Sequence, residues 1–303
     1  MTHSGKGGSI KAMFVMGENP LLSDPHLHRV KETFENLDFL AVSDIFLTET
    51  AQYAHVVFPA ASFAEKRGTI TNSERRVQLC RQAIPPIGNC RSDAQIIMEL
   101  GRRLDCPGME FDSSDEIMEE ISLLTPIYGG MHYDRLEQNH GLQWPCWNRD
   151  HEGTEFLHKY YFTRGKGQFT ITKHQEPAER TDREYPYTLV TGRGSYHHYH
   201  TATMTRNSKR LVREYPEALL EINAADAKTL QLRDSEKIEL LSKRGKVRIS
   251  ITITDRVQPG TVFSSFHFFE VPINQLTTSA MDPKSKCPEF KVCSVNLRRV
   301  NND

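Results

Sequence analysis

The chain has 303 residues, of which 38% are hydrophobic, so it is long enough to bury a sizeable core and to divide into two domains. Lys and Arg number 38 against 39 Asp and Glu, and the formal charge of -1 excludes a whole-protein field that would attract nucleic acid or anionic lipid. No run approaches the roughly 20 apolar residues of a membrane helix. The first residues, MTHSGKGGS, lack a signal-peptide core, so we expect a cytoplasmic protein without membrane insertion.

The first hundred residues predict an α/β arrangement. Three short apolar runs, residues 10–17, 39–44 and 55–60, are followed by polar or turn-forming residues and are expected to be buried strands. Their alternation with helices predicts a mainly parallel sheet covered by helices. Functional groups in such sheets gather where the strands end, which here points to residues 17–19, to Ser43 and Asp44, and to the loop of residues 59–68.

The spacing of apolar residues predicts the helices that alternate with these strands. In the first helix, residues 26–37, four positions share one face: Leu27, Val30, Phe34 and Leu37. In a later helix, residues 93–104, four positions are expected to face the core: Ile96, Ile97, Leu100 and Leu104. Residues 48–53 predict a further short helix.

The last third of the chain changes to β character. Regularity fades over residues 106–184, where we expect an ordered but irregular connector. Residues 237–255 alternate apolar and polar side chains about an Arg-Gly turn, which predicts a hairpin. Helical pattern is confined to residues 207–213 and 224–230, so a small β-barrel with short helices fits best from residue 185 onward.

The six cysteines predict reduced, mostly structural thiols. They include no CxxC or CxxxC pair, which is the usual spacing of zinc sites and Cys-ligated iron–sulfur clusters. They lie far apart along the chain: Cys80, Cys90, Cys106, Cys146, Cys287 and Cys293.

Two aspartates are candidate ligand-binding groups, because a carboxylate at a strand end can accept the N1–H and N2–H donors of a guanine base. Asp44 ends the second strand and Asp93 begins a helix. The alternative is structural, and on pattern alone it is favoured: Asp44 suits a turn cap, and the Ser92-Asp93 pair suits a helix cap.

Two loops have the composition of anion and ring-binding sites. Lys66 and Arg67 precede Gly68, whose backbone allows close approach of a phosphate, although such Lys-Arg pairs are usually just solvated. Residues 192–208 combine glycines, hydroxyls, an arginine and flat rings, which suit a nucleotide or pterin. Metal ligation by the histidines there is disfavoured, because adjacent strand side chains point to opposite faces and no carboxylate accompanies them.

Several long runs, in order, resemble the bis(molybdopterin guanine dinucleotide) oxidoreductase family of the dimethyl sulfoxide reductase superfamily: MFVMGENP (13–20), SDIFLTETAQYAHVVFPAASFAEKRGTITNSERRVQ (43–78) and SDAQII (92–97). Within it, YGGMHYDRLEQNHGLQWPC (128–146) is similar to formate dehydrogenase catalytic subunits rather than to nitrate or dimethyl sulfoxide reductases. The resemblance covers nearly the whole chain after Ser9. It implies part of a Rossmann-like αβα domain over residues 1–110, an irregular connector over 111–184 and a double-psi β-barrel that binds a dinucleotide over 185–303.

The resemblance also implies cofactor contacts. In the α/β domain, five residues would hold one guanine dinucleotide: Asn19, Ser43, Asp44, Lys66 and Asp93. In the barrel domain, one loop and three later residues would contact the cofactor: Gly192, Arg193, Gly194, Ser195, Tyr196, His197, His198, Tyr199, His200, Thr201, Phe266, Asn274 and Lys291. The last three, taken alone, would more often be core, cap and surface residues. The Gly194-Ser195 pair replaces a bulkier, more hydrophobic pair common in the family.

The family's catalytic groups would precede the GENP motif, so the resemblance implies a half that this sequence does not carry. That half holds an iron–sulfur segment, a metal-ligating Cys or selenocysteine with a neighbouring His, and an Arg that binds formate. We therefore expect no catalytic residue and no metal ligand here, and no activity of the isolated chain. The implied cofactor is bis(molybdopterin guanine dinucleotide) with molybdenum or tungsten, and a [4Fe-4S] cluster is expected only in the missing half.

The first hypothesis is one piece of a split or truncated formate dehydrogenase, which would oxidise formate to carbon dioxide with loss of two electrons. Its expected partners are the amino-terminal half of the catalytic subunit and iron–sulfur electron-transfer subunits. The alternatives are a non-catalytic carrier or assembly module for the dinucleotide cofactor, and an inactive gene fragment. A missing half would leave apolar area exposed, which predicts poor solubility of the chain alone.

Overall fold

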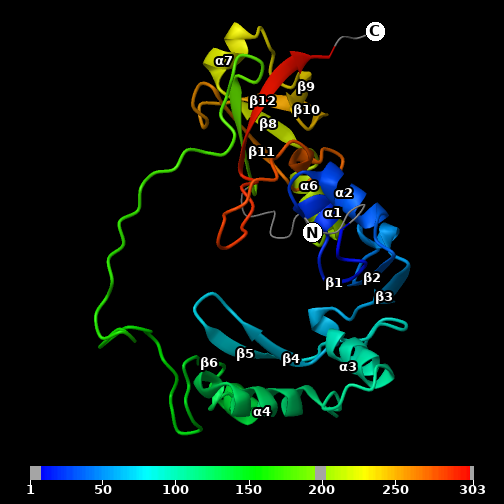
Figure 1. Cartoon of the computed structure of the whole chain (residues 1–303), viewed down its shortest axis with the longest axis vertical. Helices are drawn as coiled ribbons and strands as arrows, with labels where there is room; N and C mark the ends of the chain where they lie inside the picture. The colour runs from blue at the N-terminus through cyan, green and yellow to red at the C-terminus, as the bar shows by residue number, and fades with distance from the viewer. Residues whose placement is uncertain (1–7, 195–202, 301–303) are drawn as a thin grey trace. The chain divides into compact units, whose positions relative to one another are not determined.

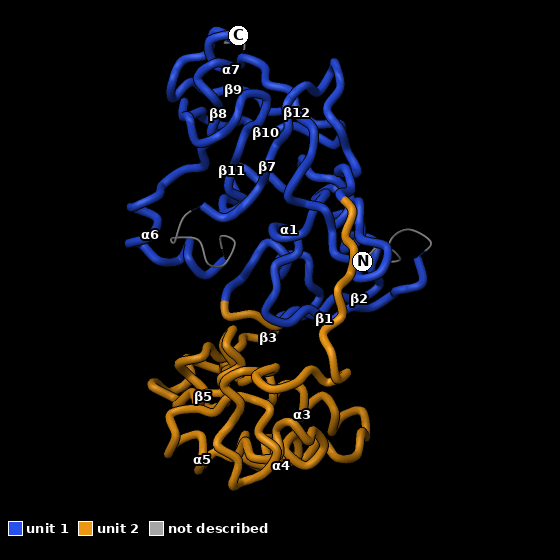
Figure 2. Tube along the Cα trace, turned by 90° about the vertical axis from the view of Figure 1, so that its left-hand side faces the viewer, with its two compact units in different colours: residues 1–42, 46–57, 174–303 blue, residues 43–45, 58–173 orange. Residues whose placement is uncertain are grey.

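A computed structural model of the chain describes residues 8–194 and 203–300 (Figure 1). The chain divides into two compact units (Figure 2): unit 1 comprises residues 1–42, 46–57 and 174–303, and unit 2 comprises residues 43–45 and 58–173. No helix in the described part of the chain is long and apolar enough to cross a membrane.

The first sheet has three strands in the order β1 (Ala12–Met16), β2 (Phe39–Asp44) and β3 (Val56–Pro59). The intervening helices are α1 (Pro20–Ser23), α2 (Leu27–Glu35) and the 3-10 helix η1 (Ala51–Tyr53). All three strands lie where the sequence predicts them. The four apolar residues assigned to one face of the first helix are all buried, so that prediction is confirmed.

The strands of this sheet are less buried than predicted. Only one residue of β1 is buried, and none of β3 is, although β2 is buried after its first residue. The reason is that Val15, Leu40 and Val42 pack with α2 in one cluster, whereas Phe14 and Phe39 remain outside that cluster and exposed. The sheet therefore has helical cover for only part of its apolar surface.

A closed barrel of six strands follows, in the order β10-β8-β11-β7-β12-β9, which confirms the predicted mixed α/β fold with a carboxy-terminal barrel. Its strands are β7 (Tyr187–Gly192), β8 (Leu219–Ile222), β9 (Lys237–Ser242), β10 (Gly245–Ile253), β11 (Thr261–Ser265) and β12 (Val292–Arg299). β7 pairs in parallel with β11 and β8 with β10, and the other four pairs are antiparallel. The predicted hairpin is β9 and β10. The short helices are η4 (Thr205–Asn207), α6 (Lys209–Glu214), α7 (Ala224–Thr229) and η5 (Ile273–Gln275).

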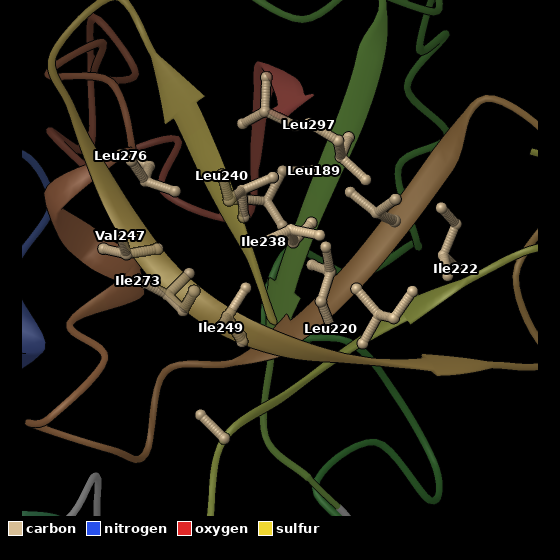
Figure 3. Packing of buried hydrophobic residues seen from close by; sticks show 14 of the residues in the cluster. Leu189, Leu220, Ile222, Ile238, Leu240, Val247, Ile249, Ile273, Leu276 and Leu297 are labelled. Atoms are coloured by element: carbon tan, nitrogen blue, oxygen red, sulfur yellow. The ribbon is translucent and has the colours of Figure 1, made fainter. Parts of the chain in front are cut away.

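Aliphatic side chains fill the barrel (Figure 3). Leu189, Leu220, Ile238, Leu240 and Ile249 point into one cluster from four different strands, and all five are buried. Each such side chain contributes about 2 kcal/mol through removal of apolar surface from water. This core stabilises the barrel and so holds the ends of its strands, from which the loops begin, in fixed positions.

Unit 2 contains an antiparallel sheet of β4 (Gly68–Thr71), β5 (Arg76–Cys80) and β6 (Leu142–Gln143). Its helices are η2 (Phe63–Glu65), α3 (Asp93–Arg103), α4 (Ser114–Leu124), η3 (Pro126–Tyr128) and α5 (Tyr133–Gln138). Helices α4 and α5 lie in the segment where no regular structure was predicted, so that expectation is wrong there. The reason is that the apolar residues of α4 do not lie on one face. Met118 and Ser122 are its only buried residues, whereas three apolar residues are exposed: Ile121, Leu123 and Leu124. Residues 144–186 contain no helix or strand beyond an isolated bridge, as predicted.

Helix α3 forms where predicted, but its assigned core face is wrong. Ile96 is buried, whereas Ile97, Leu100 and Leu104 are exposed. The pattern of apolar residues identifies a helix face that needs cover, but it does not say whether the same unit supplies that cover. Here the three residues form an exposed apolar stripe.

Candidate functional site

A cavity of about 660 Å³ lies in unit 2, and two of the predicted site residues line it. Its walls come from the loop after η2, from the first turns of α3 and α4, and from the start of α5. The polar and charged groups that define it are Lys66, Arg67, Ser92, Asp93, Ser113, Asp115 and Tyr133. A Cβ added at Gly68 would meet nothing within 4 Å, so the backbone there borders open space.

Lys66 and Asp93 form an ion pair in this cavity, with 2.7 Å between the Lys Nζ and an Asp carboxylate oxygen. Asp93 does not cap α3. Ser92 is the cap residue: its hydroxyl accepts from the N–H of Gln95, whose side chain in turn accepts from the N–H of Ser92. Because Ser92 is the cap residue of this capping box, Asp93 lies in the first turn of the helix. Its carboxylate is there available to the cavity that Lys66 also lines.

Replacing Ser92 with Ala is expected to destabilise unit 2 by about 1 kcal/mol, because the Gln95 N–H loses its capping acceptor. Both tryptophans of the chain, Trp144 and Trp147, lie in unit 2, so a urea titration followed by tryptophan emission measures this loss. Ser92→Asp retains a capping oxygen and is the matched control. Equal urea midpoints for the Ala variant and the parent chain would contradict the assignment.

Arg67 is the second cation of the cavity. Its neighbours there are Tyr133 and Asp115, which the sequence analysis did not identify as candidate site residues. Its guanidinium carbon lies 4.9 Å from the centre of the Tyr133 ring, and one of its nitrogens lies 3.4 Å from a carboxylate oxygen of Asp115. The other oxygen of Asp115 is buried and has no hydrogen-bond partner among the described residues. The only sequence signal was the run Ser113 to Glu116, which begins α4 with a capping serine and two acids.

Ser43 and Asp44 end strand β2, as predicted, and both are buried. The backbone carbonyl of Asp44 accepts from the N–H of Ala60, 3.0 Å away. The hydroxyl of Ser43 is buried and makes no hydrogen bond to the residues that the structure describes. Because buried polar groups are normally paired, this hydroxyl has an unused capacity for a ligand donor or acceptor.

The side chain of Asn19 makes hydrogen bonds to three residues of unit 1. Its carbonyl oxygen accepts from the backbone N–H and the hydroxyl of Thr50, and its amide donates to Glu49 at 2.7 Å and to Thr203 at 3.3 Å. Gly17, two residues earlier, has a φ of +64°, which suits glycine and turns the chain after β1. Asn19 therefore fixes this turn to the residues that begin η1 and to Thr203.

Three predicted barrel contacts meet at the end of β7. The N–H of Phe266 donates to the carbonyl of Gly192, and the N–H of Thr191 donates to the carbonyl of Lys291, both at 3.2 Å. A Cβ at Gly192 would lie 2.9 Å from the ring of Phe263, so a larger residue there would push on the barrel wall. Phe266 is buried and Lys291 is exposed, and Arg193 and Gly194 continue the chain from this end.

Asn274 lies against helix α1. Its amide donates to the carbonyls of Leu22 and Ser23 at 3.2 and 2.9 Å, and its backbone carbonyl accepts from the N–H of His26. Its side-chain oxygen is buried without a partner among the described residues. Asn274 thus joins the barrel domain to the first helices and has one unused acceptor.

The remaining predicted contacts lie outside the described residues: Ser195, Tyr196, His197, His198, Tyr199, His200 and Thr201. Within unit 2, Lys66 and Asp93 come together in one cavity, and within unit 1, Gly192, Phe266 and Lys291 come together at one barrel end. The grouping in unit 2 offers a cation and a carboxylate to a polar ligand, and the grouping in unit 1 offers a cation beside an aromatic ring.

Comparison with known proteins identifies both parts of the chain. Residues 1–103 match the family described as Molybdopterin oxidoreductase, and residues 187–294 match the Molydopterin dinucleotide binding domain. The chain is 44% identical over 297 residues to the F420-dependent formate dehydrogenase subunit alpha of Methanocaldococcus jannaschii, which covers 97% of this chain and 44% of that protein. It is 34% identical over 301 residues to the assimilatory nitrate reductase catalytic subunit of Bacillus subtilis, covering 96% and 42%.

The fold is similar to that of a solved structure, acetylene hydratase from Pelobacter acetylenicus. The TM-score is 0.75 at 17% sequence identity, and the match covers 96% of this chain and 44% of that one. The chain therefore spans less than half the length of each of these relatives.

Proposed function

The chain belongs to the molybdopterin oxidoreductase family of the dimethyl sulfoxide reductase superfamily, and we propose that it forms the cofactor-binding, carboxy-terminal part of a formate dehydrogenase alpha subunit. The observation that carries the proposal is the unit 2 cavity, in which Lys66 and Asp93 form a 2.7 Å pair. The similarity to a formate dehydrogenase, 44% identity along 97% of this chain, favours formate as the substrate of the complete enzyme.

The residues fit one end of a guanine dinucleotide. The cavity volume lies within the usual range for small-molecule sites, roughly 300 to 1,000 Å³. In our proposal, Asp93 accepts from the N–H donors on the guanine edge, while the ion pair with Lys66 orients that carboxylate. Ser43 and Asp44 would add contacts from the end of β2, where the Ser43 hydroxyl has no partner among the described residues.

The barrel end in unit 1 would supply a separate set of cofactor contacts. We propose that Gly192, Arg193 and Gly194 present backbone donors to the cofactor, with Phe266 packing beside them and Lys291 supplying charge. Asn19 and Asn274 would orient the segments around it, and the side-chain oxygen of Asn274, which has no partner among the described residues, can accept one donor. When bound, the molybdenum or tungsten of the cofactor would supply the redox chemistry that removes two electrons from formate.

We propose a partner polypeptide that carries the rest of the catalytic subunit, together with iron–sulfur electron-transfer subunits. Support comes from the first relative, which is named as the alpha subunit of a formate dehydrogenase. Apolar surface supports it too: Phe14 and Phe39 are exposed on the first sheet in unit 1, and Ile97, Leu100 and Leu104 form a stripe in unit 2. Such patches mark interaction surfaces in soluble proteins.

Anoxic purification of the chain from its own cells, followed by metal analysis and mass spectrometry, tests the proposal. We expect molybdenum or tungsten, a guanine-bearing pterin and a cysteine-rich second polypeptide, with formate-dependent dye reduction by the complex. The chain produced alone is expected to show no such activity. Formate oxidation by the lone chain would contradict the proposed division, and a complex that reduces nitrate without oxidising formate would contradict the substrate.

A further inference from the structure

The guanidinium of Arg67 has a fixed orientation in the unit 2 cavity. Its central carbon lies over the ring of Tyr133, 4.9 Å from the ring centre. One edge faces the carboxylate of Asp115, with 3.4 Å between nitrogen and oxygen. Tyr133 is buried at the start of α5, and Asp115 lies in the first turn of α4, so two helices hold this guanidinium in place.

Part of the Arg67 side chain remains accessible to a ligand. The side chain is 47% exposed although it contacts Tyr133 and Asp115, and Arg67 lines the cavity. The neighbouring cation, Lys66, is already paired with Asp93 at 2.7 Å. Arg67 therefore offers a flat cationic surface, whereas Lys66 serves a carboxylate.

The charges of the cavity favour a flat ring over a phosphate on this surface. Asp93, Asp112, Asp115 and Glu65 line the same cavity as Lys66 and Arg67, so a multiply charged phosphate would meet four carboxylates. A purine ring carries no net charge, donates N–H groups to carboxylates, and stacks on guanidinium planes as readily as on aromatic rings.

We propose that Arg67 is the stacking platform for the purine ring bound in this cavity, with Tyr133 and Asp115 as positioning residues beneath and beside it. This inference rests on the proposed function, in which Asp93 reads the edge of a guanine in the same cavity. Stacking on the plane of Arg67 and edge recognition by Asp93 are complementary, because one contacts the face of the ring and the other its rim.

Titration of the full chain with guanosine diphosphate and, separately, with inorganic pyrophosphate tests the proposal. Arg67→Lys keeps the charge but removes the plane, so it is expected to weaken guanosine diphosphate about 10-fold and pyrophosphate less than about twofold. Tyr133→Leu and Asp115→Asn are expected to weaken guanosine diphosphate in the same direction by a smaller factor. Arg103→Lys is the matched control, since Arg103 also pairs with a carboxylate, Glu99, but does not line the cavity.

The outcomes separate this inference from the proposed function. Equal weakening of both ligands by Arg67→Lys would assign Arg67 to phosphate and overturn the stacking role. Unchanged guanosine diphosphate binding in Arg67→Lys, together with weakened binding in Asp93→Asn, would overturn the stacking role and leave the guanine site standing. A parent chain that binds pyrophosphate but no guanosine diphosphate would overturn both. Circular dichroism of each variant establishes that it is folded.

Discussion

Replacing Glu179 with Ala is expected to destabilise unit 1 by about 3 kcal/mol, because it leaves the charge of Arg244 buried and unpaired. The guanidinium of Arg244 donates to both carboxylate oxygens of Glu179, at 2.8 and 2.6 Å, and also to the carbonyl of Leu276. Glu179 accepts a further bond from the N–H of Ser294 on β12. Both charged side chains are nearly buried, at 13% and 11% exposure.

Urea unfolding followed by far-ultraviolet circular dichroism measures this loss. The neighbouring pair of Lys243 and Asp182 provides the control, because both side chains are about half exposed. Asp182→Ala is expected to cost less than about 1 kcal/mol, as exposed ion pairs do. Equal shifts of the urea midpoint in the two variants would contradict the prediction. They would mean that the Glu179–Arg244 pair does not stabilise the attachment of the segment before β7 to the barrel.

The same pair predicts an acid limit to stability. Burial alone would raise the pKa of Glu179, but hydrogen bonds from Arg244 and from the Ser294 N–H outweigh it, so the pKa lies below the ordinary value of 4.5. A carboxyl with a lowered folded-state pKa contributes its full stability above pH 4.5 and loses it as pH falls through the folded-state pKa. The stability difference between the parent chain and Glu179→Ala should therefore shrink below about pH 4.5. A difference that stays constant into stronger acid would contradict this ionic account.

The spacing of apolar residues correctly predicted the buried faces of those elements that pack against other elements of the same unit. The face of α2 and the β9–β10 hairpin were predicted because their apolar residues recur at the period of the element and pack against adjacent strands. The face of α3 was not, since Ile97 and Leu100 need cover that unit 2 does not supply. Periodicity reports which face is apolar, and only the three-dimensional arrangement reports what covers it.

The candidate site was predictable only in part, for a related reason. Lys66 and Asp93 were assigned through family resemblance, and pattern alone favoured a capping role for Asp93 that Ser92 in fact performs. Asp115 and Tyr133 carry ordinary helix-start signals, so nothing in the sequence relates them to Arg67. Their meeting depends on how α4 and α5 pack on the sheet of unit 2.

Replacing Arg135 with Met is expected to destabilise unit 2 by about 3 kcal/mol, because three backbone carbonyls lose their shared donor. The guanidinium of Arg135 donates to the carbonyls of Gly130 at 2.7 Å, His151 at 2.8 Å and Asn148 at 3.3 Å. Gly130 permits this approach, since a Cβ there would lie 2.6 Å from the Arg135 nitrogen. Arg135→Lys should rescue little, because a single ammonium group cannot span three acceptors in one plane.

Tryptophan emission during urea unfolding measures this effect, because Trp144 and Trp147 both lie in unit 2. Arg149→Met is the matched control: Arg149 pairs with Asp134 at the surface, and its loss should cost less than about 1 kcal/mol. An Arg135→Met variant as stable as this control would mean that water replaces the guanidinium at little cost.

Helix α5 carries both Tyr133 and Arg135. Loss of the Arg135 hydrogen bonds should therefore also let Tyr133 shift beside Arg67 and weaken guanosine diphosphate binding, which couples the fold of unit 2 to its cavity.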